Sequence, residues 1–164
     1  MTIAAIDTNI LIYAVDHLAD RSKHEAAAEL LHRLGASGRA VLPLQALSEF
    51  FVVATRKGQA RPEEASDFID SLVESFPVRE PTLADLRDAI RVNKEHNVSF
   101  WDGMLWSVAR RAGARYVLSE DFQDGRELEG VLFLNPFLPG NATLLGRITA
   151  AETPAPLHDT KRAE

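Results

Sequence analysis

Two acidic residues stand where short apolar segments of the chain end, and they are the first candidates for chemistry. Asp7 directly follows Ile3-Ala4-Ala5-Ile6, and Asp121 follows Tyr116-Val117-Leu118 after two further residues. If both segments are strands of one parallel sheet, both carboxylates face the crevice beyond the carboxyl ends of the strands, where ligands bind in such sheets. Each also fits a structural role, Asp7 as a helix cap and Asp121 as a turn residue.

Two more acidic residues lie within predicted helices. Glu49 lies on a very apolar helix, and no basic residue has the helical spacing that would allow an ion pair with it. Arg56 is two turns away, about 10 Å along the axis. Its carboxylate therefore turns either to solvent or into a polar pocket. Asp102 ends the capping-box pattern Ser99-Phe100-Trp101-Asp102, in which its side chain would bond back to the start of the helix.

Several other kinds of site are not supported. The chain has no cysteine, its five histidines lack the usual zinc spacings, and it contains neither a nucleophile elbow nor a Gly-rich phosphate loop. A net charge of −6 argues against a protein that coats nucleic acid without sequence specificity, because such binding depends on basic residues. It does not argue against a nuclease that recruits cations at its catalytic centre. The basic residues Arg56-Lys57, Arg61 and Arg110-Arg111 fit either phosphate contacts or solvated helix faces.

The helices and strands that would position these acids can be predicted from the spacing of the hydrophobic residues and from the residues that begin or end each segment. Short apolar runs alternate with segments whose apolar residues recur at helical spacing. This alternation indicates βαβ units and hence an α/β fold, with a mostly parallel central sheet flanked by helices. The predicted strands are 3–6, 40–42, 116–118, 131–134 and a brief one near 78, and the predicted helices pass through 10–12, 22–34, 44–57, 62–76, 82–95 and 99–112.

The 164 residues suit one ordinary domain, and 46% of them are hydrophobic, enough for a real core. From Pro139 onward Gly, Pro, Ala and Thr dominate without a sustained period, which predicts a domain over 1–138 and a flexible tail over 139–164. The N-terminus lacks the features of a secretory signal, and no apolar stretch reaches membrane-spanning length. We therefore expect a cytoplasmic protein that does not contact membranes.

The segments around the four acids resemble the motifs of a known family. Asp7-Thr8-Asn9-Ile10-Leu11 is similar to the opening motif of PIN-domain nucleases, in particular the VapC-type toxins of bacterial toxin–antitoxin pairs. Ser48-Glu49-Phe50 resembles the segment of the second acid of that family, and Ser99-Phe100-Trp101-Asp102 that of the third. Leu118-Ser119-Glu120-Asp121-Phe122 resembles the segment of the fourth, and Asn135-Pro136-Phe137 the end of the domain. The resemblance covers nearly everything before the predicted tail.

The resemblance implies a PIN-like three-layer sandwich and a reaction. Asp7, Glu49, Asp102 and Asp121 would bind Mg²⁺ or Mn²⁺, directly or through water, since oxygen-only ligands suit these ions better than zinc. A water activated by the ion would then hydrolyse RNA phosphodiester bonds without a covalent intermediate. The implied partners are the RNA substrate, a small antitoxin that blocks the site, and a second copy of the chain.

The resemblance also gives neighbouring residues supporting roles. Thr8 and Asn9 match polar residues beside the first acid, and would orient carboxylates or metal-bound water. Ser119 matches the small hydroxyl residue that often precedes the last acid. The loop offers three acids at this point, Glu120, Asp121 and Asp124; we take Asp121 as the fourth, with Asp124 supporting the site from outside.

Other classes of function stay open. A PIN-like domain that binds RNA or protein without cleaving would usually have lost acids, whereas this chain keeps all four. A different metal-dependent phosphohydrolase would carry the same residue types. A signalling receiver domain would need a lysine after its last strand, where here Leu134 leads into Asn135-Pro136.

Overall fold

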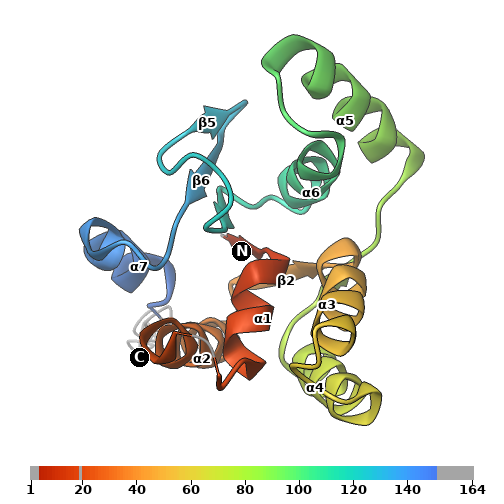
Figure 1. Ribbon diagram of the computed structural model, residues 1–164. Coiled ribbons are helices and arrows are strands. Elements are labelled where there is room, and N and C mark those ends of the chain that lie inside the picture. Colours follow the sequence, from red (N-terminus) through yellow and green to blue (C-terminus); the bar gives the residue numbers. More distant parts are fainter. Residues whose placement is uncertain (1–3, 19, 151–164) are drawn as a thin grey trace, which may run out of the picture.

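The computed structural model describes residues 4–18 and 20–150, which fold around one sheet (Figure 1). Its strand order is β3-β2-β1-β4-β6-β5, and every pair is parallel except β5 with β6. The predicted α/β fold with a mostly parallel sheet is therefore confirmed. The strands are β1 (Ala4–Ile6), β2 (Ala40–Pro43), β3 (Val78–Arg79), β4 (Tyr116–Leu118), β5 (Glu127–Leu128) and β6 (Val131–Leu134).

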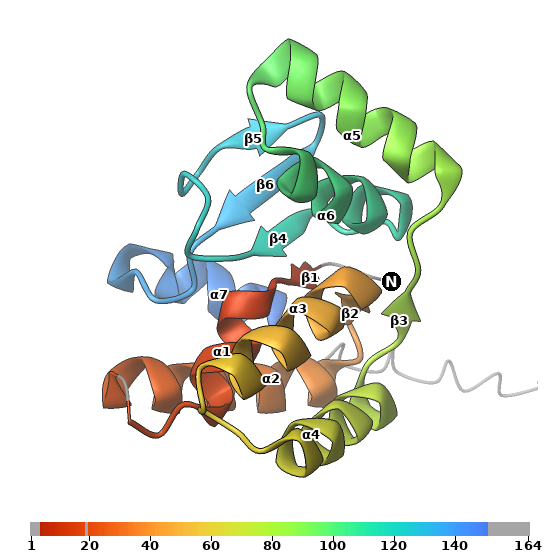
Figure 2. The ribbon, with the colours of Figure 1, turned by 45° about the vertical axis from the view of Figure 1, so that its right-hand side comes forward.

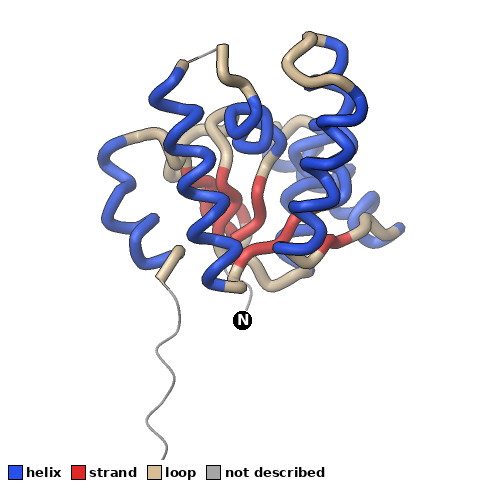
Figure 3. The backbone as a smooth tube through the Cα atoms, turned by 90° about the horizontal axis from the view of Figure 1, so that it is seen from below, coloured by secondary structure: helices blue, strands red, loops and turns tan. Residues whose placement is uncertain are grey.

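Helices cover both faces of the sheet and enclose the strands (Figure 2, Figure 3). The strand β1 shows why two cores form, because successive side chains of a strand point to opposite faces. Ala4 and Ile6 pack against α1, α2 and α7, while Ala5 packs on the side of α5 and α6. The helices are α1 (Thr8–Val15), α2 (Arg21–Ser37), α3 (Leu44–Arg56), α4 (Pro62–Ser75), α5 (Leu83–His96), α6 (Phe100–Arg111) and α7 (Ala142–Ile148), with a 3₁₀ turn, η1, over Pro139–Asn141.

The strand order reverses direction at β1, which lies between β2 and β4. Ile6 is aligned with Leu118 at the ends of β1 and β4, and the ladder continues where the Asp7 amide donates to the Leu118 carbonyl at 3.1 Å. Chain connections leave these neighbouring strands toward opposite sides of the sheet, and such a switch point opens a ligand-binding crevice. Asp7 and Ser119 are the first residues beyond it.

The packed part of the chain extends past residue 138, where the sequence predicts the start of a flexible tail. The helix α7 buries Leu145 and Ile148, three residues apart on one face, in the core that also contains Leu34 of α2 (Figure 1). Two apolar positions in one short helix are too few to show a period in the sequence. The last 14 residues of the predicted tail lie outside the described residues.

No helix in the described ranges is both long enough and apolar enough to cross a membrane.

Candidate active site

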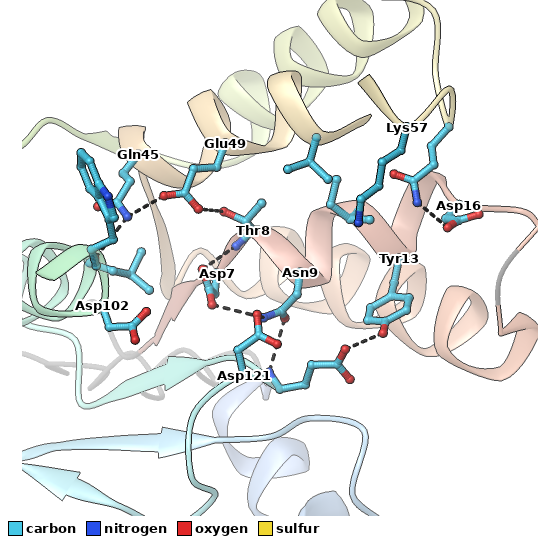
Figure 4. A pocket seen from close by; sticks show the side chains of 16 residues that line it. Asp7, Thr8, Asn9, Tyr13, Asp16, Gln45, Glu49, Lys57, Asp102 and Asp121 are labelled. Atoms are coloured by element: carbon cyan, nitrogen blue, oxygen red, sulfur yellow. Dashed lines mark hydrogen bonds between the residues drawn. The ribbon is translucent and has the colours of Figure 1, made fainter. Parts of the chain in front are cut away.

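The four predicted acids line one cavity of about 490 Å³, which we call the acid cavity (Figure 4). It opens at the switch point of the sheet, and a different element positions each acid. Asp7 joins β1 to α1, and Glu49 lies in α3. Asp102 lies in the first turn of α6, and Asp121 in the loop after β4. Residues up to 114 positions apart in the sequence thus face one space.

Asp7 is half-buried and already engaged in two directions. As the N-cap of α1, it accepts a bond from the Thr8 amide on Oδ1 at 2.7 Å. Its other oxygen, Oδ2, accepts from the Ser119 hydroxyl at 2.7 Å and from the Asn9 amide nitrogen at 3.2 Å. The carboxylate is therefore held rigidly at the floor of the acid cavity, where the same group caps a helix and faces the cavity.

The surroundings of Asp7 make it hard to ionise. Burial raises the pKa of its carboxyl to about 6, although the bonds from Ser119 and Thr8 act in the opposite direction. The nearby charges of Asp121 and Glu49 raise the pKa further. Like charges disfavour one another's ionised forms, and a bound divalent cation reverses that effect.

Ser119 and Asn9 connect Asp7 to Asp121. The buried Ser119 hydroxyl accepts from the Asn9 amide nitrogen at 2.9 Å and from the Asp121 backbone amide at 3.1 Å. The same Asn9 nitrogen lies 3.0 Å from Oδ2 of Asp121. Asn9 also accepts from the Glu120 amide at 3.4 Å. Two short polar side chains thus fix the loop after β4 against the start of α1.

Glu49 turns into a polar pocket rather than to open solvent. Its Oε1 accepts from the Gln45 side chain at 2.8 Å, and its Oε2 lies 3.3 Å from the Thr8 hydroxyl. That hydroxyl lies equally close to the Ala46 carbonyl, so its one proton serves either acceptor. Gln45 also donates to the Trp101 carbonyl at 3.2 Å, which links α3 to α6 beside the acids.

Asp102 makes only half of a capping box. The Ser99 hydroxyl accepts from the Asp102 amide at 3.2 Å, but no bond returns from the carboxylate to the Ser99 backbone within the described residues. The equivalent pattern in α5 has both bonds, between Thr82 and Asp85. The Asp102 carboxylate, free of hydrogen-bond donors in the described part of the chain, is therefore available to the acid cavity.

Asp124 lies away from the acid cavity and holds the chain after β6. Its Oδ1 accepts from the Asn135 amide and from the Asn141 side chain, both at 2.8 Å. Of the three acids in this loop, Glu120 and Asp121 line the cavity, whereas Asp124 does not. The bonds of Asp124 give it a structural role in joining two loops.

One cluster beside the acids was not predicted from the sequence. The ammonium of Lys23, in α2, lies 2.7 Å from the Glu120 carboxylate, and the Tyr13 hydroxyl of α1 bonds the same group. The carboxylate neutralised in this way immediately precedes Asp121. These residues are 97 and 107 positions from Glu120, and no local motif connects them.

The donor set fits a hard divalent cation. Six carboxylates line the acid cavity, with no histidine or sulfur ligand and one basic side chain, that of Lys57. Carboxylate and water oxygens are the ligands of Mg²⁺ and Mn²⁺. Across residues 4–18 and 20–150, no three acidic or histidine side chains are already drawn together as a finished metal site. Binding would therefore involve water molecules or small movements of the acids.

Several solved structures share the fold of this chain. The VapC20 toxin of Mycobacterium tuberculosis, described as cleaving the sarcin-ricin loop, is 20% identical with a TM-score of 0.57, over 72% of this chain and 91% of its own. A toxin–antitoxin complex from Klebsiella pneumoniae is 18% identical with a TM-score of 0.59, over 81% and 97%. VapBC2 of Rickettsia felis, bound to a promoter DNA fragment, is 13% identical with a TM-score of 0.61, over 80% and 97%.

At these identities the solved structures establish the shared fold. A sequence search among curated proteins found no match. The family model of the PIN domain, in contrast, matches residues 4–123, which include all four acids and the strands β1, β2, β3 and β4. The chain belongs to the PIN domain family.

Proposed function

We propose that this protein is a divalent-cation-dependent ribonuclease that hydrolyses RNA phosphodiester bonds. The observation that carries the proposal is the convergence of Asp7, Glu49, Asp102 and Asp121 on one cavity at the switch point of the sheet. Membership of the PIN domain family supports it, as does the likeness to VapC20, which is described as a sarcin-ricin loop cleaving toxin.

In this proposal Asp7, Glu49 and Asp102 hold Mg²⁺ or Mn²⁺, with Asp121 completing the site. When bound there, the ion would supply positive charge for the scissile phosphate and lower the pKa of a water molecule for attack on it. The protein keeps the acids in position: Asn9 and Ser119 hold Asp7 beside Asp121. Because Asp7 must ionise to bind a cation, loading the site releases a proton below about pH 6.

The remaining side chains of the site orient Glu49. Gln45 donates to one of its oxygens and Thr8 approaches the other. Hydrogen bonds to a ligating carboxylate fix its direction, and their removal weakens metal binding or activity. In this proposal Thr8 and Asn9 take the supporting roles that the family resemblance implies for them.

The biological role we propose is that of the toxin in a bacterial toxin–antitoxin pair, acting in the cytoplasm. Two of the similar structures are described as a toxin–antitoxin complex and as VapBC2 bound to promoter DNA. The partners proposed by this likeness are a small antitoxin that covers the acid cavity and a second copy of the chain.

Cleavage assays with antitoxin-free protein test the enzymatic proposal. We expect RNA cleavage with Mg²⁺ or Mn²⁺ and none in EDTA. Glu49→Gln should abolish most of the activity, whereas Glu63→Gln, the same charge change on the exposed surface of α4, should not. Binding of RNA without cleavage in every metal would contradict the proposal. Hydrolysis of small phosphate esters alone would point to a different phosphohydrolase.

A further inference from the structure

The helix α3 lines the acid cavity along its whole length with one side chain per turn. Gln45, Glu49 and Val53 of the helix and its C-cap residue, Lys57, recur at every fourth position and all border the cavity. Across from them lie Asn9, Ile12 and Tyr13 of α1 and its C-cap residue, Asp16. The cavity is therefore a groove between two helices, with the four acids at one end and Lys57 at the other (Figure 4).

Lys57 is the one basic side chain among the described residues that line the groove. Its ammonium makes no ion pair or hydrogen bond with any residue in the described ranges. The other lysine near the groove, Lys23, is already paired with Glu120. The carboxylate of Asp16 shares the far end with Lys57, but it accepts from the Gln59 side chain at 2.6 Å and the Leu18 amide at 3.1 Å.

The spacing separates Lys57 from the reaction centre. Lys57 is eight positions after Glu49, which corresponds to about 12 Å of helix. One phosphate cannot contact the metal site and this lysine at once. An RNA strand whose scissile phosphate lies against the acids, and which continues along the groove, passes Lys57 with a different phosphate.

We propose that Lys57 binds a phosphate of the substrate RNA on the far side of the groove from the scissile bond, and so fixes the position of the strand. Lysine commonly binds phosphate as a point charge. No carboxylate among the described residues forms an ion pair with Lys57 that a phosphate would have to displace. The inference rests on the proposed ribonuclease function. Lys57 acts in it as a positioning residue, because it touches the substrate away from the bond that breaks.

The first test compares Lys57→Gln with Arg56→Gln on a single-stranded RNA of known cleavage site. Arg56 is the adjacent residue, carries the same charge and does not line the groove. We expect Lys57→Gln to raise KM about tenfold with little change in kcat, as for the loss of one charge-assisted contact. Its slope of log KM against log salt should fall by about 0.7, while Arg56→Gln retains both values and Lys57→Arg restores most of the affinity.

The second test locates the phosphate. Oligonucleotides carrying one uncharged methylphosphonate at successive positions are cleaved by the parent and by Lys57→Gln. At one position beyond the scissile bond, removing the charge should raise the KM of the parent about tenfold and add nothing in the variant, because both changes delete the same contact. Direct RNA binding by Glu49→Gln and by the double variant Glu49→Gln/Lys57→Gln should show the same ratio without turnover.

The outcomes separate this inference from the function on which it rests. If the parent cleaves no RNA with either metal, both proposals fail. If the parent cleaves RNA while Lys57→Gln, with an unchanged melting temperature, keeps the parent's KM and salt slope, only the phosphate contact is overturned. The unpaired lysine would then have to serve a carboxylate of a protein partner instead.

Discussion

Two aspartates near the starts of helices, Asp7 and Asp85, have opposite environments. Asp7 caps α1 at the acid cavity, where burial and neighbouring acids raise its pKa to about 6. Asp85 lies in the first turn of α5 and is 1% exposed, more deeply buried than Asp7. Burial alone would raise the pKa of Asp85, but bonds to the ionised carboxylate outweigh it, so this pKa is lowered.

The donors around Asp85 explain the difference. Arg111 contacts both carboxylate oxygens at 3.0–3.1 Å, Thr82 donates its amide and hydroxyl, and Ser107 donates at 3.0 Å. The protein itself therefore satisfies the charge of Asp85. No protein cation contacts Asp7 within the described residues, and its neighbours are acids. An acid paired in this way supports the fold, whereas the charge of Asp7 is not balanced in this way and, in the proposed function, is met by a bound cation.

The largest effect should separate the two residues by activity. Asp7→Asn should lower the rate of RNA cleavage about 100-fold or more, because it removes a metal-binding charge at nearly constant volume. Asp85→Asn should cleave near the parental rate per folded molecule. Initial rates with Mn²⁺, with the folded fraction measured by circular dichroism, check both. Parental activity in carefully repurified Asp7→Asn would remove Asp7 from the site.

Stability should reverse the order. Asp85→Asn should lower the free energy of unfolding by about 3 kcal/mol, since it removes a buried charge that Arg111, Thr82 and Ser107 all bond. Asp88→Asn provides the control: its carboxylate is more exposed and pairs with Arg91 at 3.3 Å, so its loss should cost less than about 1 kcal/mol. Urea titrations measure both values. Equal losses would show that the Asp85 cluster has no special structural weight.

A gain in stability is expected for Asp7→Asn when metal is absent. Raising the pKa from its ordinary 3.8 to about 6 means that the ionised Asp7 destabilises the folded protein at pH 7.5, by up to roughly 3 kcal/mol. Asparagine avoids that cost and still caps a helix. In EDTA, the free energy of unfolding of the variant should therefore be about 1–3 kcal/mol higher than that of the parent.

The pH dependence of that gain has a definite sign. Well below pH 3.8 the carboxyl of Asp7 is protonated in folded and unfolded chains alike, and the difference between variant and parent should nearly vanish. It should grow as the pH rises from 3.8 through 6, the interval in which only the unfolded chain ionises readily. A difference that stays constant from pH 4 to 7.5 would contradict the raised pKa.

The smallest effect concerns the two residues of the half capping box. Ser99→Ala should cost about 1 kcal/mol with or without metal, since its hydroxyl accepts from the helix. Asp102→Asn should change the metal-free melting temperature little, but should reduce the stabilisation that Mn²⁺ gives the parent. Thermal melts in EDTA and at a series of Mn²⁺ concentrations distinguish them. A parental response to Mn²⁺ in Asp102→Asn would exclude this acid from the metal site.

Much of the fold was predictable because its strands are continuous apolar runs. Each of the four predicted longer strands and the brief one near 78 is present. The strand β5 was not predicted, because its two residues are too few to show an alternation of apolar and polar side chains. It is held by antiparallel pairing with β6. The end of α2 was also misplaced: the helix continues through Gly35 to Ser37, because Gly38 is the residue with a left-handed φ of 64°.

The candidate site was harder to predict from short sequence patterns than the fold was. The four acids were found by resemblance, because each has a structural alternative when considered singly. The sequence patterns Ser99–Asp102 and Thr82–Asp85 look the same, yet only the second closes both bonds. The contacts that separate them come from other elements, above all from Arg111 of α6. Likewise, the position of Lys57 opposite the acids depends on the packing of α1 against α3, which no short motif encodes.

The hydroxyl of Ser119 offers a spectroscopic consequence of this packing. It has one proton and two lone pairs, and all three are used: the proton lies toward Asp7, and two amide hydrogens point at the oxygen. A serine hydroxyl that neither rotates nor meets water should exchange slowly enough for its proton to give a separate NMR signal. Paramagnetic Mn²⁺ bound by the adjacent carboxylate would broaden that single resonance first, so one proton would report the occupancy of the whole cavity.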